Sequence, residues 1–162
     1  MLKSLGKGDR RVEDRWPLRK VISGGQTGAD RAGLEAAKRL GYETGGTVPR
    51  GYRTSKGPDP TLMQFGVVEH PSDRYPPRTV KNVREADGTV WFGNEETSGG
   101  KLTLATARRM ARPLLINPTA GELRAWIVGQ NIGVLNVAGD RETNSPGIQG
   151  KVEEILVEAL VR

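Results

Sequence analysis

The stretch VISGGQTGAD, residues 21–30, runs directly into RAGLEAAKRLG, residues 31–41. An apolar start is followed by three glycines and then by a helical pattern whose small, apolar face consists of Ala29, Gly33, Ala36, Ala37 and Leu40. We expect Thr27 to cap this helix, with Asp30 three residues on, and Gly41 to end it. Glycines let backbone approach a ligand closely, and the first N–H groups of a helix lack partners, so this unit predicts an anion-binding site.

Short apolar runs alternate with helical patterns from residue 19 onward, which predicts a mostly parallel sheet covered by helices. The expected strands are residues 20–23, 43–47, 66–70, 89–92, 114–116 and 133–137. The expected helices are residues 28–40, 77–86, 101–111, 120–130 and 147–161. Residues 49–64, rich in proline, glycine and charge, are expected to form a long loop. The predicted fold class is α/β, a doubly wound Rossmann-like sheet with helices on both faces and ligands at the carboxyl edge of its strands.

The composition is that of an ordinary globular protein, because 35% of the 162 residues are hydrophobic and 27% are charged. We assign residues 19–162 to a single ligand-binding domain and residues 1–18, which lack periodicity, to a basic N-terminal extension. No apolar run is long enough to span a bilayer, and the N-terminus lacks the apolar segment of a secretory signal. We therefore expect a cytoplasmic protein without a membrane partner.

The net charge of +6 is concentrated near the N-terminus. Residues 1–20 contain seven Lys or Arg and three acids, whereas the rest of the chain contains 18 basic and 16 acidic residues. A basic leader on a near-neutral body is more typical of a solvated tail or an oligomer arm than of a DNA-binding surface. We expect no nucleic-acid partner.

Metal and thiol chemistry is limited by the residues available. The chain has no cysteine and one histidine, His70, which precedes a proline at the end of an apolar segment. These counts exclude disulfides, thiolate nucleophiles, sulfur-ligated zinc and multi-histidine metal sites, and we assign no metal ligands. A structural role for His70 is favoured over catalysis.

A second glycine site lies in ETSGGKLTLATARRMARP, residues 96–113, between a predicted strand and a predicted helix. Its glycines would place backbone N–H groups at another helix N-terminus. Either glycine turn alone is explained equally well by a tight turn with a cap, but two on one sheet edge favour a shared phosphate site. The candidate residues are Gly24, Gly25, Gln26, Thr27, Gly28 and Asp30 in the first loop and Ser98, Gly99, Gly100 and Thr103 in the second.

Between the two loops, Arg78 and Asn82 fall four residues apart on one predicted helix face. A guanidinium suits a phosphate, and an amide can read the edge of a base or a pterin, although a solvated helix face explains the spacing equally well. Asn136, Gly139 and Arg141 lie at the end of the last predicted strand, where a plain connection to the next helix explains Gly139 equally well.

Standard nucleotide fingerprints are absent. SGGQTG lacks the Gly-Lys-Ser/Thr end of a P-loop, and it matches G-x-G-x-x-G only if Ser23 replaces the first glycine. Glu43 lies only roughly where a ribose-binding acid is expected. An ordinary NAD dehydrogenase is therefore disfavoured.

Five segments together resemble the molybdenum-cofactor carrier family, a Rossmann-like branch related to the LOG and lysine-decarboxylase-like proteins. The segments are ISGGQTGADRAGLEAA, GGTVPRGYRT, RTVKNVREADGTVWF, SGGKLTLATA and LNVAGDRETNSPGI, and they span about residues 19–160. The resemblance implies a doubly wound domain, oligomers such as dimers or tetramers, and binding of molybdopterin-type cofactor through its phosphate and pterin. Onto the first loop it carries over Gly24, Gly25, Gln26, Thr27, Gly28 and Asp30. Onto later segments it carries over Arg78, Asn82, Gly99, Gly100 and Thr103, while Thr47, Pro49 and Gly51 fall in the family's second glycine turn.

Two departures bear on function. LOG-type phosphoribohydrolases use P-G-G-x-G-T-x-x-E, whereas this chain has Ser98-Gly99-Gly100-Lys101-Leu102-Thr103 and no following glutamate. Asp140 also stands where the carrier family commonly has proline. The missing carboxylate weighs against an enzyme and in favour of a binding protein for a phosphorylated pterin or nucleotide-like ligand, with molybdenum cofactor as the leading candidate.

Two alternatives remain open. An enzyme that cleaves an N-glycosidic or phosphoester bond in a nucleotide would use Asp30, Glu43 or Asp87 as acid or base. A sensor that binds a nucleotide signal and changes its oligomeric contacts would use the same phosphate site.

Overall fold

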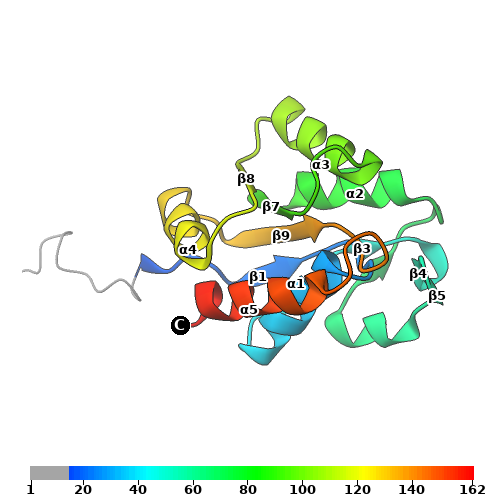
Figure 1. Ribbon diagram of the computed structural model, residues 1–162, viewed down its shortest axis with the longest axis horizontal. Coiled ribbons are helices and arrows are strands. Elements are labelled where there is room, and N and C mark those ends of the chain that lie inside the picture. Colours follow the sequence, from blue (N-terminus) through cyan, green and yellow to red (C-terminus); the bar gives the residue numbers. More distant parts are fainter. Residues whose placement is uncertain (1–14) are drawn as a thin grey trace, which may run out of the picture.

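The computed structural model describes residues 15–162, and its centre is a sheet of five parallel strands (Figure 1). In spatial order the strands are β2 (Glu43–Gly45), β1 (Lys20–Ile22), β9 (Val134–Gly139), β7 (Gly88–Phe92) and β8 (Leu114–Ile116). Helices cover both faces of the sheet, so a central strand such as β7 is buried along its whole length. The predicted α/β, Rossmann-like fold class is confirmed.

The helices form one layer on each face (Figure 1). On one face α1 (Ala29–Arg39) packs against α5 (Ile148–Leu160), which also contacts α4 (Ala120–Gly129). On the other face α2 (Tyr75–Glu85) packs against α3 (Ser98–Arg109). Within residues 15–162, no helix combines the length and the apolar character needed to cross a membrane.

The connections diverge from the middle of the sheet. β1 leads through α1 to β2 at one edge, β7 leads through α3 to β8 at the other edge, and β9 lies between β1 and β7. In open α/β sheets a crevice forms outside the carboxyl ends of the strands where successive connections part. The fold therefore leaves a crevice at the ends of β1, β9 and β7.

Gly33 sets how closely α1 approaches the sheet. A Cβ at this position would lie 2.7 Å from the Cβ of Val137 on β9. We expect Gly33→Ala to lower the free energy of unfolding by about 1–3 kcal/mol, the usual cost of overpacking a core. Urea unfolding measures this, with Gly129→Ala in α4 as the matched control, because a Cβ there meets nothing within 4 Å. Equal stability of the two variants would contradict the assigned packing.

Residues 46–70 depart from the predicted pattern. The predicted strand 43–47 is divided at Gly46, where φ is 119° and a Cβ would lie 2.8 Å from the Ser23 nitrogen. Beyond it, β3 (Thr47–Val48) pairs with β6 (Val68–Glu69) in a separate two-stranded sheet, so the predicted strand 66–70 lies outside the main sheet. The predicted loop 49–64 contains a hairpin and two short 3₁₀ helices: β4 (Arg53–Thr54), β5 (Gly57–Pro58), η3 (Arg50–Tyr52) and η4 (Pro60–Phe65). A small apolar cluster joins this excursion to α1 and consists of Leu34, Val48, Leu62, Phe65 and Val67.

The ends of the chain and of the helices refine the prediction. Residues 1–14 of the predicted N-terminal extension lie outside the described residues. Within the described part, Trp16 donates a hydrogen bond from its indole nitrogen to the Tyr42 hydroxyl at 2.6 Å.

The N-cap of α1 is Gly28 and not the predicted Thr27. The Thr27 hydroxyl instead accepts the N–H of Glu142 at 3.3 Å. Helix α3 begins at Ser98, ahead of the predicted residue 101, because the Thr97 side chain caps it.

Candidate ligand-binding site

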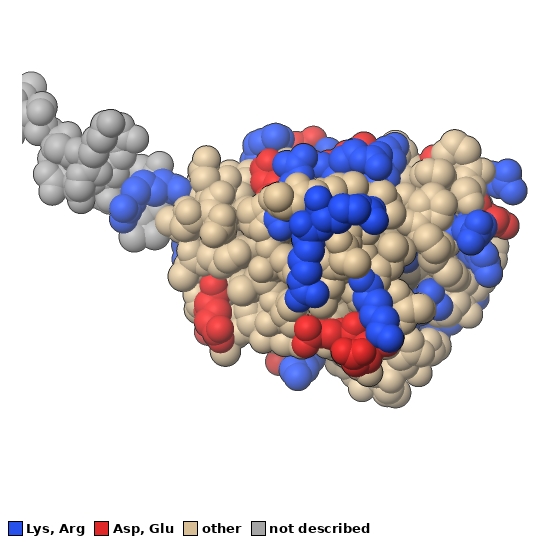
Figure 2. Space-filling view, turned by 90° about the horizontal axis from the view of Figure 1, so that it is seen from above, with Lys and Arg blue, Asp and Glu red and all other residues tan. Residues whose placement is uncertain are grey.

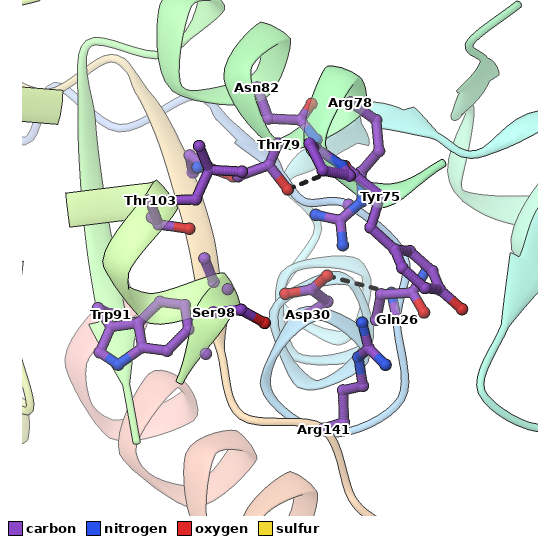
Figure 3. Close-up of a pocket in the computed structure, with 17 residues that line it drawn as sticks. Gln26, Asp30, Tyr75, Arg78, Thr79, Asn82, Trp91, Ser98, Thr103 and Arg141 are labelled. Atoms are coloured by element: carbon purple, nitrogen blue, oxygen red, sulfur yellow. Dashed lines mark hydrogen bonds between the residues drawn. The ribbon is translucent and has the colours of Figure 1, made fainter. Parts of the chain in front are cut away.

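A cavity of about 260 Å³ lies at the carboxyl ends of β1, β9 and β7 (Figure 3). Its walls come from the first glycine loop, the first turn of α1, the inner faces of α2 and α3, and the turn after β9. Eight of the twelve candidate residues line it: Gly24, Gln26, Asp30, Arg78, Asn82, Ser98, Gly99 and Thr103. Segments far apart in the sequence thus meet at the crevice that the topology leaves open.

The other four candidates shape the loops beside the cavity. Gly25 and Gly28 have φ values of 72° and 86°, which side chains rarely adopt, and Gly28 lies against the backbone of the turn after β9. Gly100 packs against the carbonyl of Asn94 and donates its N–H to the Thr97 hydroxyl at 3.0 Å. Together with Thr27, these residues do not contact the cavity directly.

Two of the five N–H groups in the first glycine loop, Gly24–Gly28, are occupied within the chain, as is that of Ala29 at the start of α1. Gly25 donates to the Ser23 hydroxyl at 3.3 Å, and Ala29 donates to the carbonyl of Asp140 at 3.1 Å. Gln26 donates to a carboxylate oxygen of Asp30 at 3.1 Å. The Asp30 carboxylate therefore takes the position at the start of α1 where we expected an external anion.

The second glycine loop has N–H groups that remain available. Ser98 and Gly99 are the first two residues of α3, and their backbone N–H groups have no hydrogen-bond partner among residues 15–162. Both residues are exposed and line the cavity. This end of the cavity has the donors that an anion needs.

Two guanidinium groups face the cavity from opposite sides. Arg78 comes from α2 and Arg141 from the turn after β9, and both point toward the space beside Asp30 (Figure 3). The guanidinium carbons lie 5.7 Å and 4.3 Å from the centre of the Tyr75 ring, which orients both groups. Within the described residues neither side chain has a hydrogen-bond or ion-pair partner, and Nε of Arg78 is buried without one.

The charges in the cavity are destabilised by their burial. Burial raises the pKa of the Asp30 carboxyl, an effect that the nearby Arg78, the Gln26 N–H and Arg141 oppose. Burial lowers the pKa of the Arg78 guanidinium, which Asp30 counteracts and Arg141 reinforces. A guanidinium stays protonated in proteins, so Arg78 carries a charge without a close counter-ion. An anionic ligand would supply that counter-ion.

The buried negative charge of Asp30 lowers the stability of the folded chain by an amount that depends on pH. Because its pKa is raised above the ordinary value of 3.8, the folded chain binds this proton more tightly than the unfolded chain, and stability falls as pH rises from about 4. Asp30→Asn removes the charge but keeps an oxygen for Gln26. We expect its Tm to be higher than that of the wild type by about 2–4 °C at neutral pH, the shift that about 1 kcal/mol produces in a chain of this size.

Thermal unfolding from pH 4 to pH 8 tests this expectation. The gap between Asp30→Asn and the wild type should widen with pH, whereas Asp73→Asn, a change at an exposed acid before α2, should follow the wild type. A wild type that is more stable than Asp30→Asn throughout the range would show that the carboxylate is not desolvated.

Asn82 has a structural contact that its spacing did not reveal. Its amide oxygen accepts the N–H of Thr47 at 2.8 Å and its amide nitrogen donates to the Thr47 carbonyl at 2.9 Å. The side chain thus pairs with β3 as a neighbouring strand would, and it joins α2 to the excursion. One N–H of the amide is left for a ligand.

Other lining residues escaped the sequence analysis. Tyr75 and Trp91 had no motif to mark them, and Arg141 was noted only for its place at the end of the last predicted strand. Asp140 accepts the N–H of Asn94 at 3.1 Å and the hydroxyl of Ser145 at 2.7 Å. It thereby fixes the loop that leads to α3 against the turn that carries Arg141.

A larger hollow of about 570 Å³ lies beside the N-terminus of α5. Two of its polar side chains are already engaged, because Asp140 holds Asn94 and Ser145, and Asn117 exchanges hydrogen bonds with the backbone of Gly93. The smaller cavity, with its unpartnered guanidinium groups, is the better candidate for a charged ligand.

The surface above the cavity is basic. Figure 2 looks onto the face with α2 and α3, where Lys and Arg are prominent. Helix α2 carries Arg78, Lys81 and Arg84 against one acid, and α3 carries Lys101, Arg108 and Arg109 without an acid. Such a field attracts anionic ligands toward the site.

Only one of the three acids considered for catalysis is in the cavity. Glu43 lies at the amino end of β2, where it is exposed and 3.8 Å from the Lys20 ammonium group. Asp87 lies at the same far edge, where it accepts the N–H groups of Gly133 and Val134 at 2.9 and 2.8 Å. A catalytic role for Glu43 or Asp87 in this cavity is therefore wrong, and Asp30 is the remaining carboxylate.

Comparison with known proteins identifies the family. Residues 21–160 match the circularly permutated YpsA SLOG family. The crystal structure of a "putative molybdenum carrier protein" from Syntrophus aciditrophicus SB superposes with a TM-score of 0.82 at 33% sequence identity, over 90% of this chain and 96% of that one. No curated protein matches the chain. On these matches, the chain belongs to the circularly permutated YpsA SLOG family.

Proposed function

We propose that the protein binds and protects a phosphorylated pterin or nucleotide-like ligand, with molybdenum cofactor as the leading candidate. The observation that carries this proposal is the pair of guanidinium groups, Arg78 and Arg141, that face one cavity without partners among the described residues. The free N–H groups of Ser98 and Gly99 lie in the same wall. The similarity to a protein described as a molybdenum carrier supports the choice of cofactor.

The residues present suit the phosphate and the ring of such a cofactor. Arg78, Arg141 and the start of α3 would hold the phosphate, and the buried face of Trp91 with Leu102 and Ala138 would contact the ring. A cavity of about 260 Å³ is close to the lower limit of about 300 Å³ for small-molecule sites, so it would enclose the phosphate and part of the ring system. The dithiolene of the cofactor would hold the molybdenum, so the protein need not supply metal ligands. Residues 15–162 contain no cluster of three His, Cys, Asp or Glu suited to a metal ion.

The test is retention of the cofactor. Purified protein is mixed with molybdenum cofactor released from a molybdoenzyme, passed through a desalting column, and analysed for molybdenum and pterin. We expect stoichiometric retention by the wild type and loss of retention in Arg78→Ala. Equal retention by both proteins would place the ligand elsewhere, and no retention by the wild type would exclude this cofactor.

A nucleotide hydrolase is the second candidate, favoured by one observation. Asp30 is a buried carboxyl with a raised pKa beside the phosphate site, as a general acid would be. The test is incubation with nucleoside monophosphates and detection of released base or phosphate. Turnover that disappears in Asp30→Asn would support this function, and absence of turnover across the panel would count against it.

A further inference from the structure

Asp30 is the one acid among the residues that line the cavity, and its carboxylate is only partly engaged. One oxygen accepts the Gln26 N–H at 3.1 Å, whereas the other has no partner among residues 15–162. The side chain is 4% exposed and no basic group lies within 4.0 Å of it. A buried acceptor of this kind needs a donor, and a ligand in the cavity can provide it.

Gln26 adds a second buried acceptor at the same wall. Its amide nitrogen donates to the carbonyl of Arg53 at 2.9 Å, which fixes the orientation of the amide. The amide oxygen points away from this contact, and it is buried without a partner among the described residues. Gln26 is 3% exposed, so bulk water does not satisfy it.

The cavity thus presents two kinds of group to a ligand. Arg78, Arg141 and the start of α3 offer donors and positive charge, whereas Asp30 and Gln26 offer acceptors. Both guanidinium groups lie beside Asp30, so a ligand in this space needs an anionic group for the guanidinium groups and the α3 N–H groups, and N–H donors for the carboxylate (Figure 3). The part of the ligand near Asp30 must carry N–H donors.

The walls between these groups suit a flat ring. Trp91, Leu102, Ala138 and Pro76 supply apolar surface. A guanine ring and a pterin ring both present an N–H next to an amino group, two donors that match the two oxygens of a carboxylate. Adenine presents an amino group next to a ring nitrogen that is itself an acceptor, which a carboxylate disfavours.

We propose that Asp30 accepts hydrogen bonds from the ring N–H and the adjacent 2-amino group of a guanine- or pterin-type ring, while Arg78 and Arg141 hold the phosphate of the same ligand. This inference rests on the proposed phosphate-binding function and adds the class of ring. Asp30 is then the residue that selects the ligand, and a carboxylate at this position discriminates against adenine.

The test compares four probes by titration calorimetry: GMP, AMP, XMP and neopterin phosphate. We expect the wild type to bind GMP or neopterin phosphate about 10- to 100-fold more tightly than AMP, the discrimination typical of one bidentate contact. GMP against neopterin phosphate then shows which of the two rings the site prefers.

Asp30→Asn should change the preference of the protein between GMP and XMP, which a purely structural role of Asp30 would not do. The Gln26 N–H holds the oxygen of the new amide, so its nitrogen faces the cavity and offers a donor where the wild type has an acceptor. We expect this variant to lose about 10- to 100-fold in affinity for GMP and to gain affinity for XMP, which has an oxygen in place of the 2-amino group.

The outcomes separate this inference from the proposed function. Equal affinity of the wild type for GMP and AMP, with both lost in Arg78→Ala, would overturn the inference and keep the phosphate site. Failure of Asp30→Asn to change the GMP to XMP preference would also overturn it. If the wild type bound none of the four probes, the inference would be overturned, whereas the proposed function would still be decided by retention of molybdenum cofactor.

Discussion

Arg78→Ala should weaken binding of GMP and AMP by the same factor, about 100-fold. The guanidinium is held over Gly24, whose added Cβ would lie 2.8 Å from its central carbon, and it has no partner in the described part of the chain. Two charge-assisted hydrogen bonds to a phosphate contribute about 3 kcal/mol together, which corresponds to this factor. Titration calorimetry of both nucleotides measures it.

Arg84→Ala is the matched control for this prediction. Arg84 lies on the same helix, is exposed and does not line the cavity, so its loss should leave both affinities within about twofold of the wild type. Comparable losses in the two variants would indicate a general effect of surface charge. An unchanged affinity in Arg78→Ala would remove this residue from the site.

Gly99→Val should also weaken the binding of GMP, by about 10-fold or more. Gly99 is the second residue of α3, and a Cβ there meets no atom within 4 Å, so the fold can accept a side chain. Its branched side chain would crowd the N–H groups at the start of α3, and removal of about two hydrogen bonds to an anion has an effect of this size. Affinity for GMP, measured with the melting temperature, tests the prediction.

Gly121→Val offers a closely matched comparison. Gly121 is likewise the second residue of a helix, α4, and has open space around its Cβ, but it lies far from the cavity lining. We expect both variants to unfold within about 0.5 kcal/mol of the wild type, since neither change causes a clash. If Gly99→Val bound GMP as well as Gly121→Val does, the start of α3 would not contact the phosphate.

The fold was predictable because local patterns and topology agree. Residues 20–22, 114–116 and 120–129 form the expected strands and helix, since apolar runs of strand length and capped helical patterns leave few alternatives. The division at Gly46 was not predictable, because it depends on how closely that glycine approaches Ser23 in the folded chain. The extra hairpin in residues 53–58 is similarly fixed by local turns within a segment that lacks periodicity.

The location of the site could be predicted from the sequence, but the contacts that its residues make could not. Parallel strands bring the two glycine loops to one edge, so the location followed from the sequence. The roles of individual groups depend on distances that spacing does not contain. Asp30 and Asn82 were both candidate ligand contacts and both line the cavity, but their bonds to the Gln26 N–H and to Thr47 did not follow from the sequence. Arg141 became a site residue only because the turn after β9 folds toward Tyr75.

A crystal structure of the protein with bound GMP tests the central claim most directly. The account predicts phosphate density between the guanidinium groups of Arg78 and Arg141, within hydrogen-bond distance of the Ser98 and Gly99 N–H groups. Phosphate density against the first glycine loop at Gly24–Gly28, or outside the cavity altogether, would contradict it.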